Sequence, residues 1–384
     1  MKPSLNWPLL ALAVGAFAIG TTEFTPMGLL PVIAQGLQVS VPRAGGLVTA
    51  YAMGVMIGAP VMTLLLTRFR RKLSLMLLMG IYVAGNLLSA VSADYNVLFA
   101  ARVLTSLAHG AFFGLGAVEA SLLVAPDRRA SAVATMFMGL TVANIIGVPA
   151  ATWLGMNHGW HMAFGVTALL GVLTMVAVQL ALPAREIGPP PDVAAELRVL
   201  TRGNVLLALL TTAIGAGAMF VLYTYIAPIL QHITHASSIV ITVALMLTGV
   251  GFSIGNAIGG RSADRSLDGS LLVFFPVLGC VMLAFPWMAR TVLGALLGTL
   301  AWGTATFALM PALQMRVMQA AHGAPALASS MNIGAFNLGN ALGAAFGAIA
   351  LSMGLGYAGI SVIGTVLALF GAGLVLLSRK VAPP

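Results

Sequence analysis

Long apolar stretches alternate along the chain with short segments rich in arginine, glycine and proline. A helix of about 20 apolar residues is long enough to cross a hydrocarbon core of roughly 30 Å. The pattern therefore predicts twelve membrane-spanning helices. They are expected near residues 8–30, 44–66, 73–92, 97–124, 131–155, 161–182, 204–230, 237–260, 270–289, 291–315, 324–350 and 355–378.

The second half of the sequence repeats the first. A shift of 197 positions superposes several pairs, among them Gly20 and Gly217, Pro31 and Pro228, Gly54 and Gly251, Gly58 and Gly255, and Arg68 and Arg265. Parallel repeats of six helices are typical of one large class of secondary transporters. We therefore expect an all-α integral membrane protein with two six-helix bundles, residues 1–182 and 204–384.

A linker at residues 183–203 joins the two predicted bundles. It begins with a proline-rich run that cannot continue a helix. Its end, up to about residue 202, is expected to form a short amphipathic helix on the inner surface.

Composition excludes a soluble protein. Hydrophobic residues make up 60% of the chain and charged residues only 7%, whereas soluble domains carry about a quarter charged residues. If both termini are cytoplasmic, the inner loops receive most of the lysines and arginines, and only Arg43 and Arg290 lie outside. This positive-inside bias predicts a multi-pass protein of a bacterial inner membrane with both termini in the cytoplasm.

The net charge of +9 reflects this topology and contact with lipid headgroups. It does not indicate a nucleic-acid partner, because the cations are spread over many short loops. Cys280 is the only cysteine and is expected to be a small buried residue. No metal-ligand spacing and no nucleophile with a nearby base are present. We therefore expect no metal, no cofactor and no enzymatic activity.

Ionisable side chains inside membrane spans are costly and usually functional. Glu23 lies in the first predicted span, and Arg102 and His109 lie in the fourth. At about 1.5 Å per residue, Glu23 and Arg102 fall at similar depth, so they can pair. Two interpretations stay open: a carboxylate that exchanges a proton, or a fixed ion pair between helices. His109 is either a proton relay or a hydrogen-bonded core histidine. Glu119, near the inner end of the fourth span, ranks below Glu23.

Arg102, Thr105, Ser106 and His109 are spaced so that all four can line one face of the fourth helix. Pro26 removes a helical hydrogen bond three residues after Glu23, so a kinked or unwound first helix is expected there. Further polar or aromatic groups inside spans are candidates for lining a substrate cavity, or for hydrogen bonds between helices. They are Thr22, Asn144, Tyr223, Tyr225, Trp302, Thr304, Thr306, Asn332, Asn337 and Asn340.

The loop after the second span, Thr63-Leu-Leu-Leu-Thr-Arg-Phe-Arg-Arg-Lys72, resembles the inner-loop motif of the major facilitator superfamily, Gly-x-Leu-Ala-Asp-Arg-x-Gly-Arg-Arg. The second copy, Gly260-Arg-Ser-Ala-Asp-Arg265, keeps the glycine, aspartate and arginine of that motif. The resemblance implies an inner gate formed by Arg68, Arg71, Asp264 and Arg265. It implies that this gate rests more on Asp264 than on the first half.

Two further motifs narrow the resemblance. Arg102-x7-Gly110-x3-Gly114 is similar to the fourth-helix motif of proton-coupled members, and Gly139-x7-Gly147-Val-Pro149 to the fifth-helix motif of antiporters. The chain resembles the drug:proton antiporter family, in particular the branch named for arabinose, sugar and purine-nucleoside efflux permeases. This implies coupling by Glu23, Arg102 and His109.

The predicted function is therefore export of a small organic molecule, such as a sugar, nucleoside or drug-like compound, in exchange for protons. Alternating access of two rocking bundles would drive it without a cofactor. The alternative is uptake by proton symport or facilitated diffusion on the same fold. A channel, a structural membrane protein and a membrane-embedded enzyme are less favoured. The expected partners are substrate, protons and lipid, and one chain suffices for a complete path.

Overall fold

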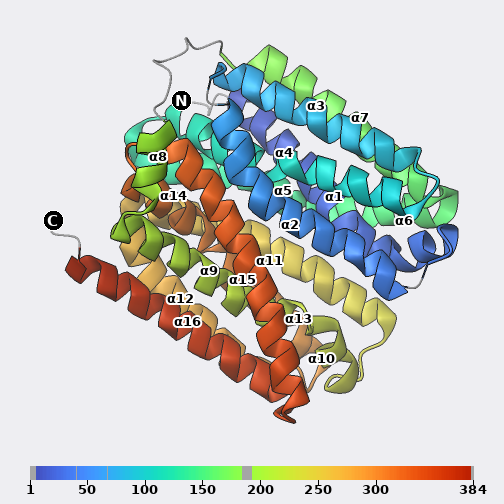
Figure 1. The fold of residues 1–384 in the computed structure, drawn as a ribbon. Coiled ribbons are helices and arrows are strands. Elements are labelled where there is room, and N and C mark those ends of the chain that lie inside the picture. Colours follow the sequence, from blue (N-terminus) through green and yellow to red (C-terminus); the bar gives the residue numbers. More distant parts are fainter. Residues whose placement is uncertain (1–5, 40, 67, 184–192, 382–384) are drawn as a thin grey trace. The chain divides into compact units, whose positions relative to one another are not determined.

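The computed structural model describes residues 6–39, 41–66, 68–183 and 193–381. Most of these residues lie in helices, and no strand occurs among them (Figure 1). Twelve helical segments within them are long and apolar enough to cross a membrane. Each predicted span coincides with one of these segments to within a few residues, so the predicted all-α architecture is confirmed.

The first half contains seven α-helices and two short helices of other kinds. They are α1 (Trp7–Gly36), α2 (Val41–Leu66), α3 (Arg71–Ala90), α4 (Tyr95–Leu122), the 3₁₀-helix η1 (Pro126–Arg128), α5 (Arg129–Val142), the π-helix η2 (Ala143–Gly147), α6 (Val148–His158) and α7 (Trp160–Ala181). The fifth predicted span is thus one continuous path through η1, α5, η2 and α6.

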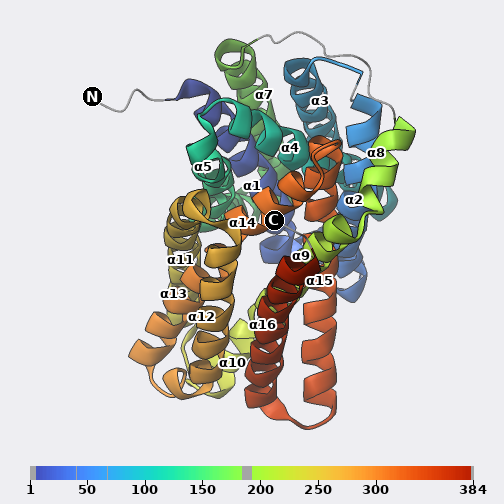
Figure 2. The same ribbon diagram turned by 90° about the vertical axis from the view of Figure 1, so that its left-hand side faces the viewer.

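The second half begins with the short helix α8 (Val193–Leu200), which confirms the helix predicted at the end of the linker. The proline run before it lies outside the described residues. The remaining helices are α9 (Gly203–Tyr223), α10 (Ile226–His232), α11 (Ser238–Arg265), α12 (Leu267–Met288), α13 (Val292–Phe307), α14 (Met310–Ala320), α15 (Pro325–Ser352) and α16 (Gly356–Val381). Figure 2 shows α9, α12 and α16 side by side.

Polar residues set the beginnings of several helices. The Asp94 carboxylate accepts hydrogen bonds from the backbone N–H groups of Asn96 and Val97 at 2.8 and 3.1 Å, which caps α4. Ser266 caps α12 in the same way through Gly269 N, at 3.0 Å. Such caps satisfy N–H groups that have no partner inside the helix.

The predicted unwinding near Pro26 is not observed, because α1 is helical from Trp7 to Gly36. Thr25 Oγ1 donates to Thr21 O at 2.6 Å, and Thr21 Oγ1 donates to Phe17 O at 2.8 Å. These bonds tie the threonine side chains to the preceding turns of the helix, and prolines are tolerated inside membrane-spanning helices. Cys280 also differs from expectation, since its side chain is exposed on α12.

The described residues group into two compact units. The first combines those of residues 1–126 and 135–196 with residues 329–334, and the second combines residues 127–134 with those of 197–328 and 335–384. The beginning of α5 thus groups with the second unit and a stretch of α15 with the first. The division predicted at residues 183–203 stays a prediction.

Candidate functional site

Arg102 lies at the centre of the first unit, on α4, and its side chain is completely buried. Its guanidinium carbon lies 4.2 Å from the ring centre of Tyr51 and 5.8 Å from that of Phe164. Nη1 donates to Thr22 Oγ1 at 3.4 Å, and Nε and Nη2 have no hydrogen-bond partner. A cation held against aromatic faces, with two free donors, is poised to bind an acceptor that comes within reach.

Glu23, the acid predicted to couple with Arg102, is adjacent in sequence to Thr22, the hydrogen-bond partner of that arginine. It lies on α1, one residue after Thr22, and its side chain is partly exposed. No hydrogen bond joins the carboxylate of Glu23 to the guanidinium of Arg102 among the described residues. No direct ion pair joins the two groups among the described residues, and both interpretations of Glu23 stay predictions.

A hydrogen-bond network beside Arg102 joins three helices. Asn86 Oδ1 on α3 accepts from Thr22 Oγ1 at 2.6 Å and from Thr167 Oγ1 of α7 at 3.0 Å. The hydroxyl of Tyr82 donates to Ala18 O of α1 at 2.6 Å. All of these polar side chains are buried. The network fixes Thr22, and therefore the helical turn that carries Glu23, against α3 and α7.

His109 also belongs to this buried group. Its Nδ1 lies 3.2 Å from the hydroxyl of Tyr51, and its ring centre lies 5.2 Å from that of Phe113. Tyr51 thus touches both predicted coupling residues of α4: its ring faces Arg102 and its hydroxyl faces His109. Of the two hydroxyl residues between them, Thr105 packs against α3, whereas Ser106 packs against α2, the helix that carries Tyr51. A Cβ at Gly85 of α3 would collide with Thr105, and one at Gly54 of α2 with Ser106.

Sequence reasoning missed Tyr51, Tyr82, Asn86 and Thr167. The search for polar groups in apolar spans that selected Asn144 would also have selected Asn86. The same search selected Tyr223 and Tyr225 and would also have selected Tyr51 and Tyr82, but it does not show which tyrosine lies beside Arg102. Their role depends on which helices become neighbours, and this is visible only in the fold.

The structure separates the predicted cavity residues into groups. In the second unit, the rings of Tyr223 and Trp302 stack with centres 5.6 Å apart, and Phe252 packs against both. Thr306 donates to the backbone oxygen of Trp302 at 2.8 Å. Trp302 is completely buried, and its Nε1 has no hydrogen-bond partner. Tyr223, Phe252 and Trp302 thus form a packed aromatic cluster in the second unit.

The other cavity candidates lie elsewhere. Tyr225 donates to Ala344 O of α15 at 2.9 Å, and so joins α15 to the end of α9. Asn144 lies in η2 and donates to Leu140 O at 3.0 Å. Asn337 is buried and Asn340 half-buried on the part of α15 in the second unit, whereas Asn332 lies in the first unit.

The predicted inner-gate residues take different positions. Asp264, at the end of α11, accepts from the backbone N–H groups of Ala130 at 2.8 Å and Ser131 at 3.2 Å, and from the hydroxyl of Ser131. Asp264 therefore holds the N-terminal turn of α5, where the helix dipole favours a carboxylate. Arg68, Arg71 and Arg265 do not share this contact.

Arg71 pairs with Glu119 instead. Its Nη1 lies 3.7 Å from Oε2 of Glu119, which is buried near the end of α4. Arg68 and Arg265 are exposed. Glu119 is thus part of an ion pair at the end of the first unit where α3 begins, away from the group around Arg102.

The residues of the antiporter-like motif pack α5 and η2 closely against α1. A Cβ at Gly139 would collide with the carbonyl oxygen of Ala13, and one at Gly147 with Thr21 Oγ1. Pro149 follows in the first turn of α6. Glycine is required at these positions because the helix backbones nearly touch. Among the described residues, no group of three or more histidine, cysteine, aspartate or glutamate side chains could hold a metal ion.

Comparisons with known proteins agree with this fold. The inner membrane transport protein YdhP of Escherichia coli K12 is 58% identical over 379 residues, which cover 99% of this chain and 97% of YdhP. A chloramphenicol resistance protein of Streptomyces lividans is 35% identical over 342 residues, covering 88% of this chain and 87% of that protein.

Among solved structures, the fucose:proton symporter FucP of Escherichia coli superposes with a TM-score of 0.78 at 14% identity. The match covers 99% of this chain and 100% of FucP, and it supports the predicted major facilitator fold. The Major Facilitator Superfamily is a family of transporters and not of enzymes. The pattern that describes the Major Facilitator Superfamily matches residues 12–348, and the chain therefore belongs to that family of secondary transporters.

Proposed function

We propose that this transporter exports a small organic molecule in exchange for protons across a bacterial inner membrane. The observation that carries the proposal is the buried guanidinium of Arg102, which has two free donors and bonds to Thr22, the residue next to Glu23 on α1. A group of this kind responds to the charge on the carboxylate. It therefore converts one protonation step into a change in local packing.

In the proposed cycle Glu23 carries the proton. The deprotonated carboxylate attracts Arg102, and protonation removes that attraction, which leaves the guanidinium against the ring of Tyr51. Because the hydrogen bond from Thr22 to Asn86 holds the adjacent turn of α1, the change is transmitted to the helix that carries Glu23. His109 serves as an alternate proton carrier through its contact with Tyr51.

Two observations support export in preference to uptake. The antiporter-like motif maps onto the tight contact of α5 and η2 with α1, the helix that carries Glu23. In addition, a relative at 35% identity is named for resistance to chloramphenicol, a property that removal of the drug from the cell would produce. Sugars, nucleosides and drug-like compounds are the proposed cargo, and the half-buried ring of Tyr223, which stacks on Trp302, is the member of this aromatic group that a planar ring could reach.

The direction of coupling decides between the proposal and its alternatives. Purified protein is reconstituted into vesicles with an acidic interior or an acidic exterior. Uptake of a labelled pentose, a labelled purine nucleoside and tetraphenylphosphonium is then followed. A proton antiporter accumulates its cargo on the acidic side, and a proton symporter accumulates it on the alkaline side.

We expect at least one compound to accumulate in acid-loaded vesicles and to leave when a protonophore collapses the gradient. Empty vesicles serve as the control for passive partitioning of the cation. Accumulation only in alkaline-loaded vesicles would establish the symporter. Equilibration that ignores both gradients would establish facilitated diffusion, and either outcome would overturn the proposal.

A further inference from the structure

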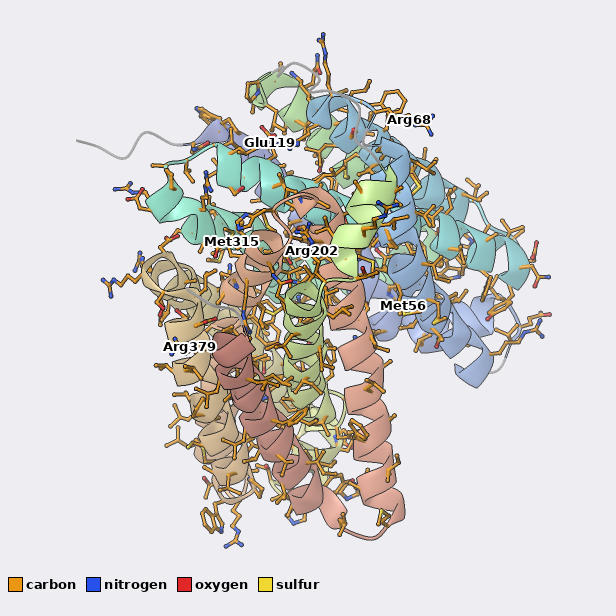
Figure 3. All side chains as sticks on the ribbon, turned by 60° about the vertical axis from the view of Figure 1, so that its left-hand side comes forward. Met56, Arg68, Glu119, Arg202, Met315 and Arg379 are labelled. Carbon is orange, nitrogen blue, oxygen red and sulfur yellow. The ribbon has the colours of Figure 1, made fainter. Side chains whose placement is uncertain are left out.

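A polar pocket of about 400 Å³ lies at one end of the second unit. The residues of the pocket that matter here are Arg265, Ser266, Asp268, Arg316, Gln319 and Arg379. They come from the ends of α11, α14 and α16 and from the beginning of α12. Arg379 is labelled near the end of α16 in Figure 3.

The pocket lies at the boundary of the apolar spans. Three candidate spans end at Arg265, Ala320 and Arg379, and a fourth begins at Leu267. Apolar helices change to polar segments at the depth of the lipid headgroups. A ligand in this pocket would therefore meet the charged layer of the membrane surface and not its hydrocarbon core.

The pocket carries more positive charge than its acids neutralise. Asp268 faces two arginines: its oxygens lie 3.3 Å from Nε of Arg316 and 3.3 Å from Nε of Arg379. Arg265 adds a third cation. The second acid, Asp264, already binds the N-terminal turn of α5. Two carboxylates therefore stand against three guanidinium groups, and only Asp268 pairs with an arginine of the pocket.

Arg316, which lines the pocket, has a guanidinium nitrogen without a hydrogen-bond partner. Its side chain is only 11% exposed. Nη2 donates to the hydroxyl of Ser378, whereas the buried Nη1 has no hydrogen-bond partner. A buried charged donor without an acceptor is costly, and an anion in the pocket would satisfy it. The N-terminal turn of α12 adds a helix dipole that favours negative charge at the same place.

We propose that this pocket binds a phosphate group that carries net negative charge. Arginine forks suit the planar, multi-oxygen face of a phosphate, and Gln319 supplies an additional amide donor. Two sources share this chemistry: an anionic phospholipid of the surrounding leaflet, and free inorganic phosphate. The competing interpretation is an ionic cluster that only ties α12, α14 and α16 together.

The test measures ligand binding to the full-length protein in detergent by native mass spectrometry and by the shift in unfolding temperature. Phosphatidylglycerol, phosphatidylcholine and inorganic phosphate are titrated separately. Arg379→Gln and Gln319→Leu remove pocket contacts from partly exposed positions. Arg290→Gln is the matched control, because it removes an exposed arginine just beyond the opposite end of α12.

We expect phosphatidylglycerol to bind at least about tenfold more tightly than phosphatidylcholine, whose choline cation cancels the charge. Arg379→Gln should weaken that binding about tenfold, the effect of losing roughly 1.4 kcal/mol, and Arg290→Gln should leave it unchanged. Protection by inorganic phosphate that Arg379→Gln also abolishes would support the site and assign it to the soluble anion. If Arg379→Gln and Gln319→Leu fold normally and bind all three ligands as the wild type does, the cluster is ionic only and the proposal is wrong.

Discussion

Arg102 is a cation buried within a membrane helix whose direct neighbours are mostly aromatic. Cation–π contact with Tyr51 contributes about 2 kcal/mol when desolvated, far less than the cost of burying an isolated charge. The hydrogen bond to Thr22 supplies part of the remainder. The free energy of the buried Arg102 cation therefore changes strongly when its surroundings change. This property suits a residue that couples proton binding to conformation better than one that only holds helices together.

Tyr51 contacts Arg102 through its ring and His109 through its hydroxyl, so substitutions at this position test the two contacts separately. Tyr51→Phe keeps the ring over Arg102 and removes only the contact with His109, so we expect transport to fall less than about threefold. Tyr51→Leu removes the ring as well and should lower proton-coupled transport at least about tenfold, because the lost contact exceeds roughly 1.4 kcal/mol. Initial rates in vesicles provide the measurement. Equal rates in Tyr51→Leu and wild type would show that the ring has no part in coupling.

Single residues also show how far the sequence could lead. Glu23, Arg102 and His109 stood out because charge inside an apolar span is rare, and the structure places all three in one unit. Asn86 followed the same rule and was overlooked. Tyr51 and Thr167 are tyrosine and threonine residues in spans like others that were selected, but their position beside Arg102 and Asn86 comes from the register between neighbouring helices and not from their spacing along the chain.

At the scale of helices, α1 packs along α5, η2 and α6 through small residues. Gly20, Gly28, Gly139, Gly147 and Gly155 all lie where an added Cβ would collide with the facing helix. Inside a membrane, such close backbone contact replaces the hydrophobic drive of water as the source of helix association. The same close packing occurs in the second half between α15 and α9, where a Cβ added at Gly339 or Gly343 would collide with backbone oxygens of α9.

Gly139→Ala tests this contact. The new methyl group would overlap the carbonyl oxygen of Ala13, and overpacking of this kind costs about 1–3 kcal/mol. We expect a lower unfolding temperature and slower transport. Gly165→Ala on α7 is the matched control, because nothing lies within 4 Å of its added Cβ. Similar unfolding temperatures for the two variants would contradict the assignment of close packing to Gly139.

The junction between Asp264 and α5 makes a second prediction at this scale. Asp264→Asn keeps the size of the side chain and removes the charge at the helix N-terminus, an interaction worth up to about 2 kcal/mol in a partly buried position. We expect a lower unfolding temperature than the wild type. Asp127→Asn, an exposed acid in the neighbouring 3₁₀-helix, is the control and should unfold like the wild type. An unchanged temperature in Asp264→Asn would show that the carboxylate holds α5 only weakly.

At the scale of the whole molecule, the corresponding ends of α2 and α11 each contact another helix, but through different side chains. In the first unit, Thr63 of α2 meets Ser330 of α15, with hydroxyl oxygens 2.6 Å apart. In the second unit, the equivalent end of α11 binds α5 through the charged group of Asp264. The second copy of the loop motif keeps the aspartate that makes this contact, and its role in an inner gate stays a prediction. The identity of the facing helix could not be read from the sequence, because the repeat shows which segments correspond and not which segments touch.

The membrane orientation can be tested with cysteine labelling. Cys280→Ser removes the only native thiol, and single cysteines then replace exposed arginines at opposite ends of the spans. An impermeant maleimide should label Arg290→Cys in intact cells and Arg128→Cys only after the membrane is opened, because the charge distribution predicts that Arg290 lies outside. Labelling of Arg128→Cys in intact cells would reverse the topology.

Proton coupling through Glu23 is the central claim, and its most direct test is the pH inside sealed vesicles. Cargo that accumulates in acid-loaded vesicles is added while a trapped dye reports proton movement. The wild type and Glu119→Gln, which changes a buried acid of the same unit, should both release protons when cargo enters. Glu23→Gln should release none, while still exchanging labelled for unlabelled cargo. Release at the wild-type rate from Glu23→Gln would show that another group carries the proton.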